Sequence, residues 1–188
     1  MGKQVAVLFA DGFEEIEGVT VVDVLRRARV QVTMIGLERR VVTGSHGIAI
    51  QADTTLSDVL TAGLWFDGVV LPGGMPGAAT LRDSPAVAEF VLSQHRRGAI
   101  AAAICAAPIV LGRAGLLAGK AATCYPGFEV DLGGAALATD AVVDAGDVIT
   151  SRGVGTALEF ALALVARFAD AATARALGDA MLVRRHAG

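Results

Sequence analysis

The sequence predicts an α/β protein in which helices cover both faces of a mostly parallel sheet. Short apolar runs at residues 5–9 and 99–104 have the length and composition of strands that are buried on both faces. Longer amphipathic segments alternate with such runs, and this alternation favours right-handed crossovers between parallel strands. The 188 residues fit one domain, 1–188, because no linker divides them.

Composition excludes several classes of protein. The formal net charge is −3 and no basic block is present, so we expect no nucleic-acid partner. No apolar run has membrane-spanning length and the N-terminus does not resemble a signal peptide, so we expect a cytoplasmic protein that contacts no membrane. The two cysteines, Cys105 and Cys124, do not form a disulfide framework or a zinc motif. We therefore expect no metal and no cofactor.

The first half of the chain begins with a strand and a helix at 14–28. Acids occupy the first turn of this helix and arginines its end, as the helix dipole favours. Its apolar residues cover more than one stripe, which indicates a second buried face, such as one against another subunit. An ordinary half-buried helix is the alternative. The other elements expected here are strands at 5–9, 30–37 and 66–71, a hairpin at 40–51, and helices at 56–60, 78–81 and 85–94.

The centre of the chain is the apolar strand 99–104, which Cys105 follows. Pro108 favours a helix that starts at Ala106 or Ala107. Cys105 then lies on a sharp turn between strand and helix, which is the cysteine version of a nucleophile elbow. The helix dipole would favour its thiolate. A small buried hydrophobe is the alternative.

The last third of the chain shows short β segments followed by two helices. The expected strands are 121–124, 135–138, 141–143 and 147–151, and the expected helices are 157–169 and 172–183.

Ligand sites in such sheets lie beyond the carboxyl ends of the strands, where three loops carry candidate groups. Glu17 lies in the first turn of its helix and can reach a neighbouring strand end. The Gly73-Gly74 loop could aim a backbone N–H at the same point, and the N–H of Ala106 would supply a second donor that completes an oxyanion hole beside Cys105. A thiol, a carboxyl and two N–H donors suffice for attack on a carbonyl carbon. The alternatives are that the Gly73-Gly74 pair is only a turn and that Glu17 is a solvated acid.

Several motifs resemble the DJ-one/ThiJ/PfpI superfamily, in family order across nearly the whole chain. The matching pieces are Glu14-Glu-Ile-Glu17, Asp23-Val-Leu-Arg-Arg27, Leu71-Pro-Gly-Gly74, Ala102-Ala-Ile-Cys-Ala-Ala-Pro108, Ser151-Arg-Gly-Val-Gly-Thr156 and Glu159-Phe-Ala-Leu-Ala163. The resemblance implies a flavodoxin-like sandwich and a homodimer. It also makes Cys105 the reactive cysteine, Glu17 its protonated hydrogen-bond partner, and Gly74 and Ala106 the oxyanion-hole donors.

Departures from the family pattern narrow the reaction. Peptidase-like members place His directly after the cysteine, where this chain has Ala106, and the only late histidine is His186 in the tail. A Cys-His peptidase or amidotransferase is therefore disfavoured. Tyr125 precedes Pro126 where many members have a histidine, and it either supplies a hydroxyl or packs its ring.

Three other residues keep alternatives open. His46 falls where relatives have an arginine that approaches the dimer mate, so it either enters the partner's pocket or is an exposed hairpin residue. His95 is expected on a helix surface. Cys124 is either a second redox thiol or a buried strand residue.

These observations favour a cofactor-free cysteine enzyme that acts on small reactive carbonyls, of the glyoxalase or deglycase type. Cys105 would add to an aldehyde such as methylglyoxal, and Glu17 would shuttle the proton. We expect Glu17 to be protonated at neutral pH and the pKa of Cys105 to fall below ~8.5. The alternative is a redox-responsive stress protein or chaperone whose Cys105 oxidises without turnover.

Overall fold

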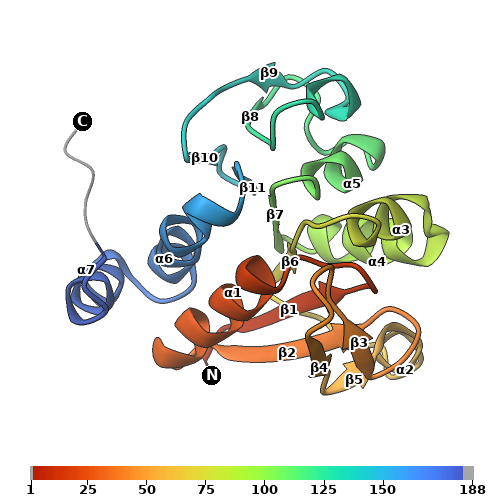
Figure 1. Cartoon of the computed structure of the whole chain (residues 1–188), viewed down its shortest axis with the longest axis horizontal. Coiled ribbons are helices and arrows are strands. Elements are labelled where there is room, and N and C mark those ends of the chain that lie inside the picture. Colours follow the sequence, from red (N-terminus) through yellow and green to blue (C-terminus); the bar gives the residue numbers. More distant parts are fainter. Residues whose placement is uncertain (1, 184–188) are drawn as a thin grey trace.

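A central sheet of seven strands runs through the molecule in the order β10-β11-β7-β6-β1-β2-β5 (Figure 1). Every neighbouring pair is parallel except β10 and β11, which confirms the predicted mostly parallel sheet. The computed structural model describes residues 2–183, so His186 lies outside the described residues. The strands of this sheet are β1 (Gln4–Phe9), β2 (Gln31–Gly36), β5 (Thr54–Thr55), β6 (Gly68–Leu71), β7 (Ile100–Ile104), β10 (Val142–Asp144) and β11 (Val148–Ser151).

Helices cover both faces of the sheet, as Figure 1 shows. One face carries α1 (Glu15–Arg27) and α6 (Ala157–Phe168), with α7 (Ala171–Ala180) packed outside α6. The opposite face carries α2 (Leu56–Thr61), α3 (Gly77–Asp83), α4 (Pro85–Arg96) and α5 (Pro108–Arg113). This two-sided cover explains why the central strands consist of apolar residues without polar alternation.

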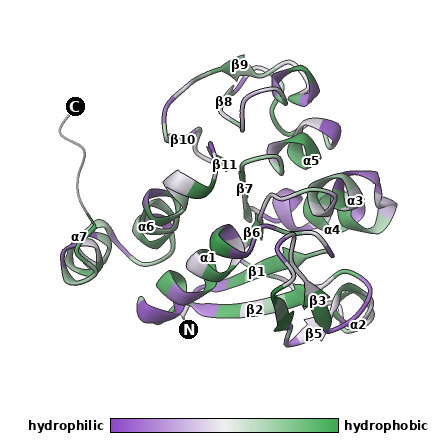
Figure 2. Cartoon of the chain, in the orientation of Figure 1, coloured by the Kyte–Doolittle hydropathy of each residue, from purple (hydrophilic) through white to green (hydrophobic). Residues whose placement is uncertain are grey.

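Strand β1 shows how the core is divided between the two faces. Val5, Val7 and Phe9 point into the cluster with α1 and α6, whereas Ala6 and Leu8 point into the cluster with α2 to α5. The side chains of a strand alternate between faces, so one apolar run supplies both cores. Figure 2 shows hydrophobic residues along the central strands and hydrophilic residues on the outer surfaces of α3 and α4.

The strand order brings the predicted site loops together. Four consecutive strands, β1, β6, β7 and β11, run parallel, so their carboxyl ends meet at one edge of the sheet. The loop after β1 leads to Glu17, the loop after β6 contains Gly73 and Gly74, and Cys105 follows β7 directly. This edge is the place where ligands bind in open parallel sheets.

Smaller elements lie outside the sheet. The predicted hairpin is present as the antiparallel pair β3 (Val41–Thr43) and β4 (Ala49–Gln51). Strand β8 (Ala121–Ala122) is shorter than expected and pairs in parallel with β9 (Ala136–Leu137). The sequence analysis missed β5 and the two 3₁₀ helices, η1 (Glu129–Asp131) and η2 (Val154–Thr156), because segments of two or three residues carry no periodic signal.

Two expectations need correction. Helix α5 begins at Pro108 rather than at Ala106 or Ala107, because residues 105–107 form a turn in which the N–H of Ala107 donates to the carbonyl of Ile104. His95 is half-buried rather than solvated, and its ring nitrogens lie 3.1 Å from the carbonyl oxygen of Ala99 and 3.2 Å from a carboxylate oxygen of Asp147. Within residues 2–183, no helix combines the length and hydropathy needed to cross a membrane.

The packing of β6 against α6 allows a test of the core. A Cβ at Gly68 would lie 2.2 Å from Cζ of Phe168, so Gly68→Ala must displace a buried ring. We expect this change to lower the free energy of unfolding by about 1–3 kcal/mol in urea titrations. Gly155→Ala is the control, because no described atom lies within 4 Å of its Cβ position, and it should change stability by less than ~0.5 kcal/mol. Equal stability of the two variants would contradict this account of the packing.

Candidate active site

Cys105 occupies the predicted sharp turn between β7 and α5. Its φ is +64°, in the left-handed region that non-glycine residues rarely adopt. This conformation costs roughly 1–2 kcal/mol and needs support from its surroundings. Two hydrogen bonds provide it: the N–H of Cys105 donates to the carbonyl of Ser151 at 2.9 Å, and the carbonyl of Cys105 accepts from the N–H of Tyr125 at 2.8 Å. The thiol is half-buried, so small reagents can reach it.

Glu17 projects from the first turn of α1 toward the sulfur and has no exposed surface. Its Oε2 accepts a hydrogen bond of 2.8 Å from the N–H of Gly73. Its Oε1 is buried and has no hydrogen bond of good geometry within the described chain. The Cys105 thiol is the neighbouring polar side chain that interacts with this carboxyl.

The approach of Glu17 to Cys105 depends on the absence of a side chain at Gly73. A Cβ there would lie 2.6 Å from Cβ of Cys105 and 2.8 Å from Oε2 of Glu17. The next residue, Gly74, has a φ of +87°, and a Cβ there would lie 2.4 Å from the backbone nitrogen of Glu14. Any larger residue at either position would push the loop away from the thiol.

The N–H groups of Gly74 and Ala106 both donate to the sulfur of Cys105. The structure therefore brings together the four residues predicted for the catalytic centre: Cys105, Glu17, Gly74 and Ala106. In this structure the two donors face the sulfur itself, where they stabilise negative charge on the thiolate. An oxygen on a carbon bonded to the sulfur would lie in the same polar environment.

Burial dominates the electrostatics of the pair. It raises the pKa of Glu17 to about 7, although the hydrogen bonds from Gly73 and Cys105 act in the opposite direction. Burial and the nearby Glu17 charge raise the pKa of Cys105 to about 12, against the smaller effect of the Ala106 and Gly74 amides. The expected elevation for Glu17 is thus present, but the expected fall for Cys105 is wrong, because desolvation outweighs the two N–H donors.

A shallow cavity of about 400 Å³ opens beside the thiol. Tyr125 lies on its wall, half-exposed, with its ring edge-on to Phe128 at a centroid separation of 6.5 Å. Gly153 also lines this cavity, and a Cβ there would lie 3.9 Å from the sulfur of Cys105 and 3.2 Å from the Tyr125 ring. The Tyr125 ring thus packs near the entrance to the thiol, and a role for its hydroxyl stays a prediction.

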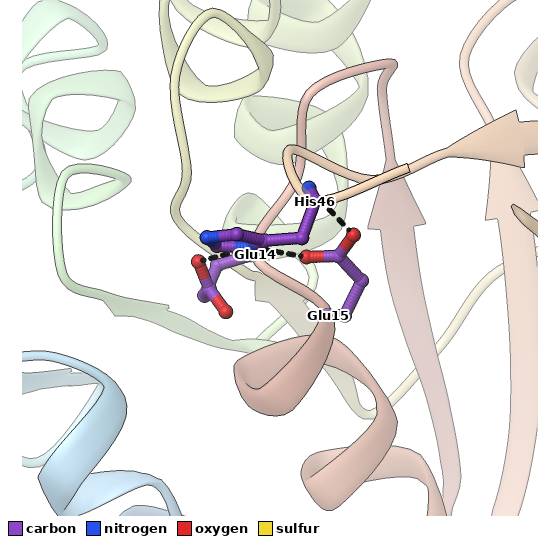
Figure 3. A group of neighbouring side chains, drawn as sticks. All are labelled: Glu14, Glu15 and His46. Carbon is purple, nitrogen blue, oxygen red and sulfur yellow. Dashed lines mark hydrogen bonds and ion pairs between the residues drawn. The ribbon is translucent and has the colours of Figure 1, made fainter. Parts of the chain in front are cut away.

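His46 lies in the turn between β3 and β4, and its side chain is exposed. Its Nδ1 is 3.0 Å from Oε2 of Glu15 and 3.6 Å from Oε2 of Glu14, as Figure 3 shows. Glu15 is buried and also accepts hydrogen bonds from the N–H groups of His46 and Ile48. Burial alone would raise the pKa of Glu15, but these hydrogen bonds bring it down to about 2. The carboxylate therefore anchors the hairpin, and it raises the pKa of His46.

Glu14, Glu15 and His46 are the described residues that could together hold a metal ion, because their ligand atoms lie within 4.8 Å of one another. The hydrogen bonds from Ser45, His46 and Ile48 already occupy the Glu15 carboxylate, so we assign this cluster to the structure of the hairpin.

Cys124 is buried just beyond β8 rather than within a strand. This position denies reagents access to its thiol, whereas Cys105 is partly open.

Sequence reasoning missed three contributors to the site. Gly73 provides the N–H that holds Glu17, whereas the Gly73-Gly74 loop was expected only to aim a donor at the reacting centre. Glu15 was regarded as a first-turn acid that complements the helix dipole, but it is buried against the hairpin. Gly153 closes one side of the thiol, and only its place in the motif that follows β11 could have indicated a role.

Comparisons with known proteins agree with this geometry. The DJ-1beta structure of Drosophila melanogaster superimposes with a TM-score of 0.93 at 40% identity, covering 98% of this chain and 100% of that one. Protein DJ-1 homolog B of Arabidopsis thaliana is 40% identical over 189 residues, which are 99% of this chain and 43% of that longer protein. The Caenorhabditis elegans protein named Glutathione-independent glyoxalase DJR-1.2 is 38% identical over 154 residues, 81% of each chain.

The family assignment follows from these similarities and from a sequence profile. The profile of the DJ-1/PfpI family matches residues 3–167, which include all four residues predicted for the catalytic centre. The relatives share both the sequence and the fold over nearly the whole chain. The chain belongs to the DJ-1/PfpI family.

Proposed function

We propose that this protein is a cofactor-free cysteine enzyme that acts on small reactive carbonyls, of the glyoxalase or deglycase type. The observation that carries the proposal is the buried Glu17 carboxyl, whose pKa is raised to about 7, beside the partly exposed sulfur of Cys105. A group with a pKa near the working pH can both donate and accept a proton. The glyoxalase name of the C. elegans relative supports the same chemistry. Both cysteines are free, which suits a reducing cytoplasm.

In the proposed reaction, the Cys105 thiolate adds to the aldehyde carbon of methylglyoxal. The aldehyde oxygen takes the proton of Glu17. The Glu17 carboxylate then removes the hydrogen of that carbon, which gives an enediolate, and returns it as a proton to the neighbouring carbon. The hydroxyl proton on the first carbon passes to the oxygen of the second, which gives a lactate thioester. Water hydrolyses the thioester, releasing lactate and the free thiol. The N–H groups of Gly74 and Ala106 stabilise negative charge at the sulfur and at the adjacent oxygen. Each step is a proton transfer or an addition, so the cycle needs no cofactor.

The same first step would serve a deglycase. The thiolate replaces the nitrogen at the former aldehyde carbon of an aminocarbinol, so that a C–S bond forms and the C–N bond breaks, and Glu17 transfers its proton to the departing amine. The second candidate is a redox-responsive stress protein or chaperone in which Cys105 oxidises without turnover. The two N–H donors at the sulfur and a Glu17 carboxyl that its elevated pKa keeps partly protonated favour this candidate. These groups could donate hydrogen bonds to the oxygens of a sulfinate.

We also propose that the protein is a homodimer whose interface includes α1. Ile16 and Val19 on this helix are 54% and 45% exposed, although they are apolar and lie next to the buried face of α1. Burial of such side chains between two copies would complete the second apolar face of the helix. His46 lies on the adjoining hairpin, where its ring could meet the partner's site.

The proposed turnover predicts lactate from methylglyoxal. Cys105→Ser should reduce lactate formation to the level of a protein-free control, because the nucleophile is lost. Glu17→Gln keeps a hydrogen-bond donor but cannot carry the proton, so it should lower kcat by at least ~100-fold. Lactate is measured enzymatically in a coupled assay.

Cys124→Ser is the matched control for this experiment, since it removes a thiol that lies outside the centre. It should retain turnover. Absence of lactate with the wild-type protein, together with slow formation of a Cys105 sulfinate under peroxide, would refute the enzyme proposal and favour the redox alternative.

The pKa values predict a pH dependence for the alkylation of Cys105. The pair loses its first proton near pH 7, and a thiolate beside a protonated Glu17 exists only after that loss. The rate of alkylation by iodoacetamide should therefore rise as the pH increases through about 7 and then level off. In Glu17→Gln this step should vanish, leaving only the titration of the thiol itself. Identical profiles for both proteins would show that Glu17 and Cys105 are not coupled.

The dimer predicts a sedimentation mass of about twice 19.1 kDa. Val19→Asp should shift the protein toward monomer, because it introduces a charge into the proposed apolar interface. Val130→Asp is the matched control on a side chain that is 90% exposed in η1, and it should leave the mass unchanged. A wild-type monomer at micromolar concentration would contradict the proposal.

A further inference from the structure

The cavity beside the thiol has a cation on its wall. Its lining consists of Tyr125, Pro126 and the five consecutive residues 152–156, of which Arg152 is the only charged one. Arg152 is half-buried and is one of the residues that line the cavity. No step of the proposed reaction of a neutral dicarbonyl involves Arg152.

The guanidinium of Arg152 has no acidic partner. Within residues 2–183, no hydrogen bond and no ion pair engages its side chain, whereas Arg39, Arg82 and Arg167 each pair with an aspartate. Its charge acts on the buried Cys124 thiol, where Glu129 acts in the opposite direction without approaching Arg152 to ion-pair distance. An unpaired, partly desolvated guanidinium is a strong binding site for an anion.

The loop that carries Arg152 is fixed relative to Cys105. The carbonyl of the preceding residue, Ser151, accepts the N–H of Cys105, and the Ser151 hydroxyl lies 2.7 Å from that of Thr156. The Thr156 hydroxyl also donates to the carbonyl of Gly153 at 2.9 Å. A Cβ at Gly153 would lie 3.9 Å from the sulfur, so the residue next to Arg152 is close to the reacting atom.

We propose that Arg152 is a specificity-determining residue that binds the carboxylate of the substrate, so that the preferred substrates are 2-oxoaldehydes with a carboxylate at the far end. This inference rests on the proposed function for the reacting end of the substrate. One guanidinium with no second cation on the cavity wall matches a singly charged carboxylate better than a doubly charged phosphate. A spacer of a few carbons would let the aldehyde reach the thiol past Gly153 while the carboxylate contacts Arg152.

The charge at the site can be measured without turnover by comparing two alkylating reagents. Iodoacetate carries a carboxylate and iodoacetamide does not, so the ratio of their rates at Cys105 reports the local field and cancels changes in the thiol pKa. Arg152→Gln should lower the iodoacetate-to-iodoacetamide ratio by roughly 3- to 10-fold, the effect of one unit charge about 6–12 Å away at an effective dielectric constant of about 40. Arg152→Lys should retain most of the ratio.

Arg97→Gln is the matched control, because it removes the same charge from an exposed position at the opposite end of β7, before the strand begins. It should leave the ratio at the wild-type value. Equal ratios in wild type, Arg152→Gln and Arg97→Gln would overturn the anion site. A fall of the same size in both variants would overturn it as well, since the effect would then reflect net charge alone.

Turnover tests the substrate class. The wild-type protein should use 4,5-dioxopentanoate, a 2-oxoaldehyde with a terminal carboxylate, with a higher kcat/KM than methylglyoxal. Arg152→Gln should reduce this preference by at least ~10-fold, mainly through KM. If the protein converts methylglyoxal and Arg152→Gln leaves the preference intact, the inference fails while the proposed function stands. If neither dicarbonyl reacts, the proposed function fails, and the proposal for carboxylated 2-oxoaldehydes falls with it.

Discussion

The contact between the buried Glu17 carboxyl and the Cys105 sulfur is the constraint on which the rest of the site depends. A carboxyl without exposed surface would ordinarily be excluded from the core, and here one N–H donor, that of Gly73, compensates its burial only in part. The elevated pKa of Glu17 is the consequence. The strand order then follows as a requirement, because β6 must lie between β1 and β7 for the Gly73 loop to reach both groups.

The structure also supports a strained nucleophile. The left-handed conformation of Cys105 and the burial of the Glu17 carboxyl both oppose folding, and the two residues are neighbours in space. The hydrogen bonds of Cys105 run to Ser151 at the end of β11 and to Tyr125 in the segment that follows β8, so several elements hold one residue in place. Burial of apolar side chains in the two cores, one on each side of the sheet, offsets the unfavourable free energy of this site.

The sequence was informative about the fold and the catalytic centre for identifiable reasons. Short apolar runs predicted β1, β6 and β7, and Pro108 after the last run predicted the sharp turn at Cys105. The start of α5 was misplaced because Pro108 permits a helix at several registers, and the turn at 105–107 is decided by tertiary hydrogen bonds. The pKa of Cys105 was misjudged because it is a balance between desolvation and two amide donors, and depth of burial cannot be deduced from one strand. Gly73 and Arg152 depend on loop paths that periodicity does not encode.

The position of α5 and the contact with Glu17 bear on how the Cys105 thiol could lose its proton. A helix dipole cannot lower its pKa strongly, because α5 has only six residues and begins three positions after Cys105. Proton sharing with Glu17 can make the thiol reactive even though burial opposes its ionisation. When one proton remains on the pair, moving it from sulfur to carboxyl exchanges one buried negative charge for another, and the two amides at the sulfur favour the thiolate form. In the proposed enzyme, the reactivity of Cys105 would therefore depend on where the shared proton resides, and Gly73, which lets the two side chains approach, would be as important to it as either of them.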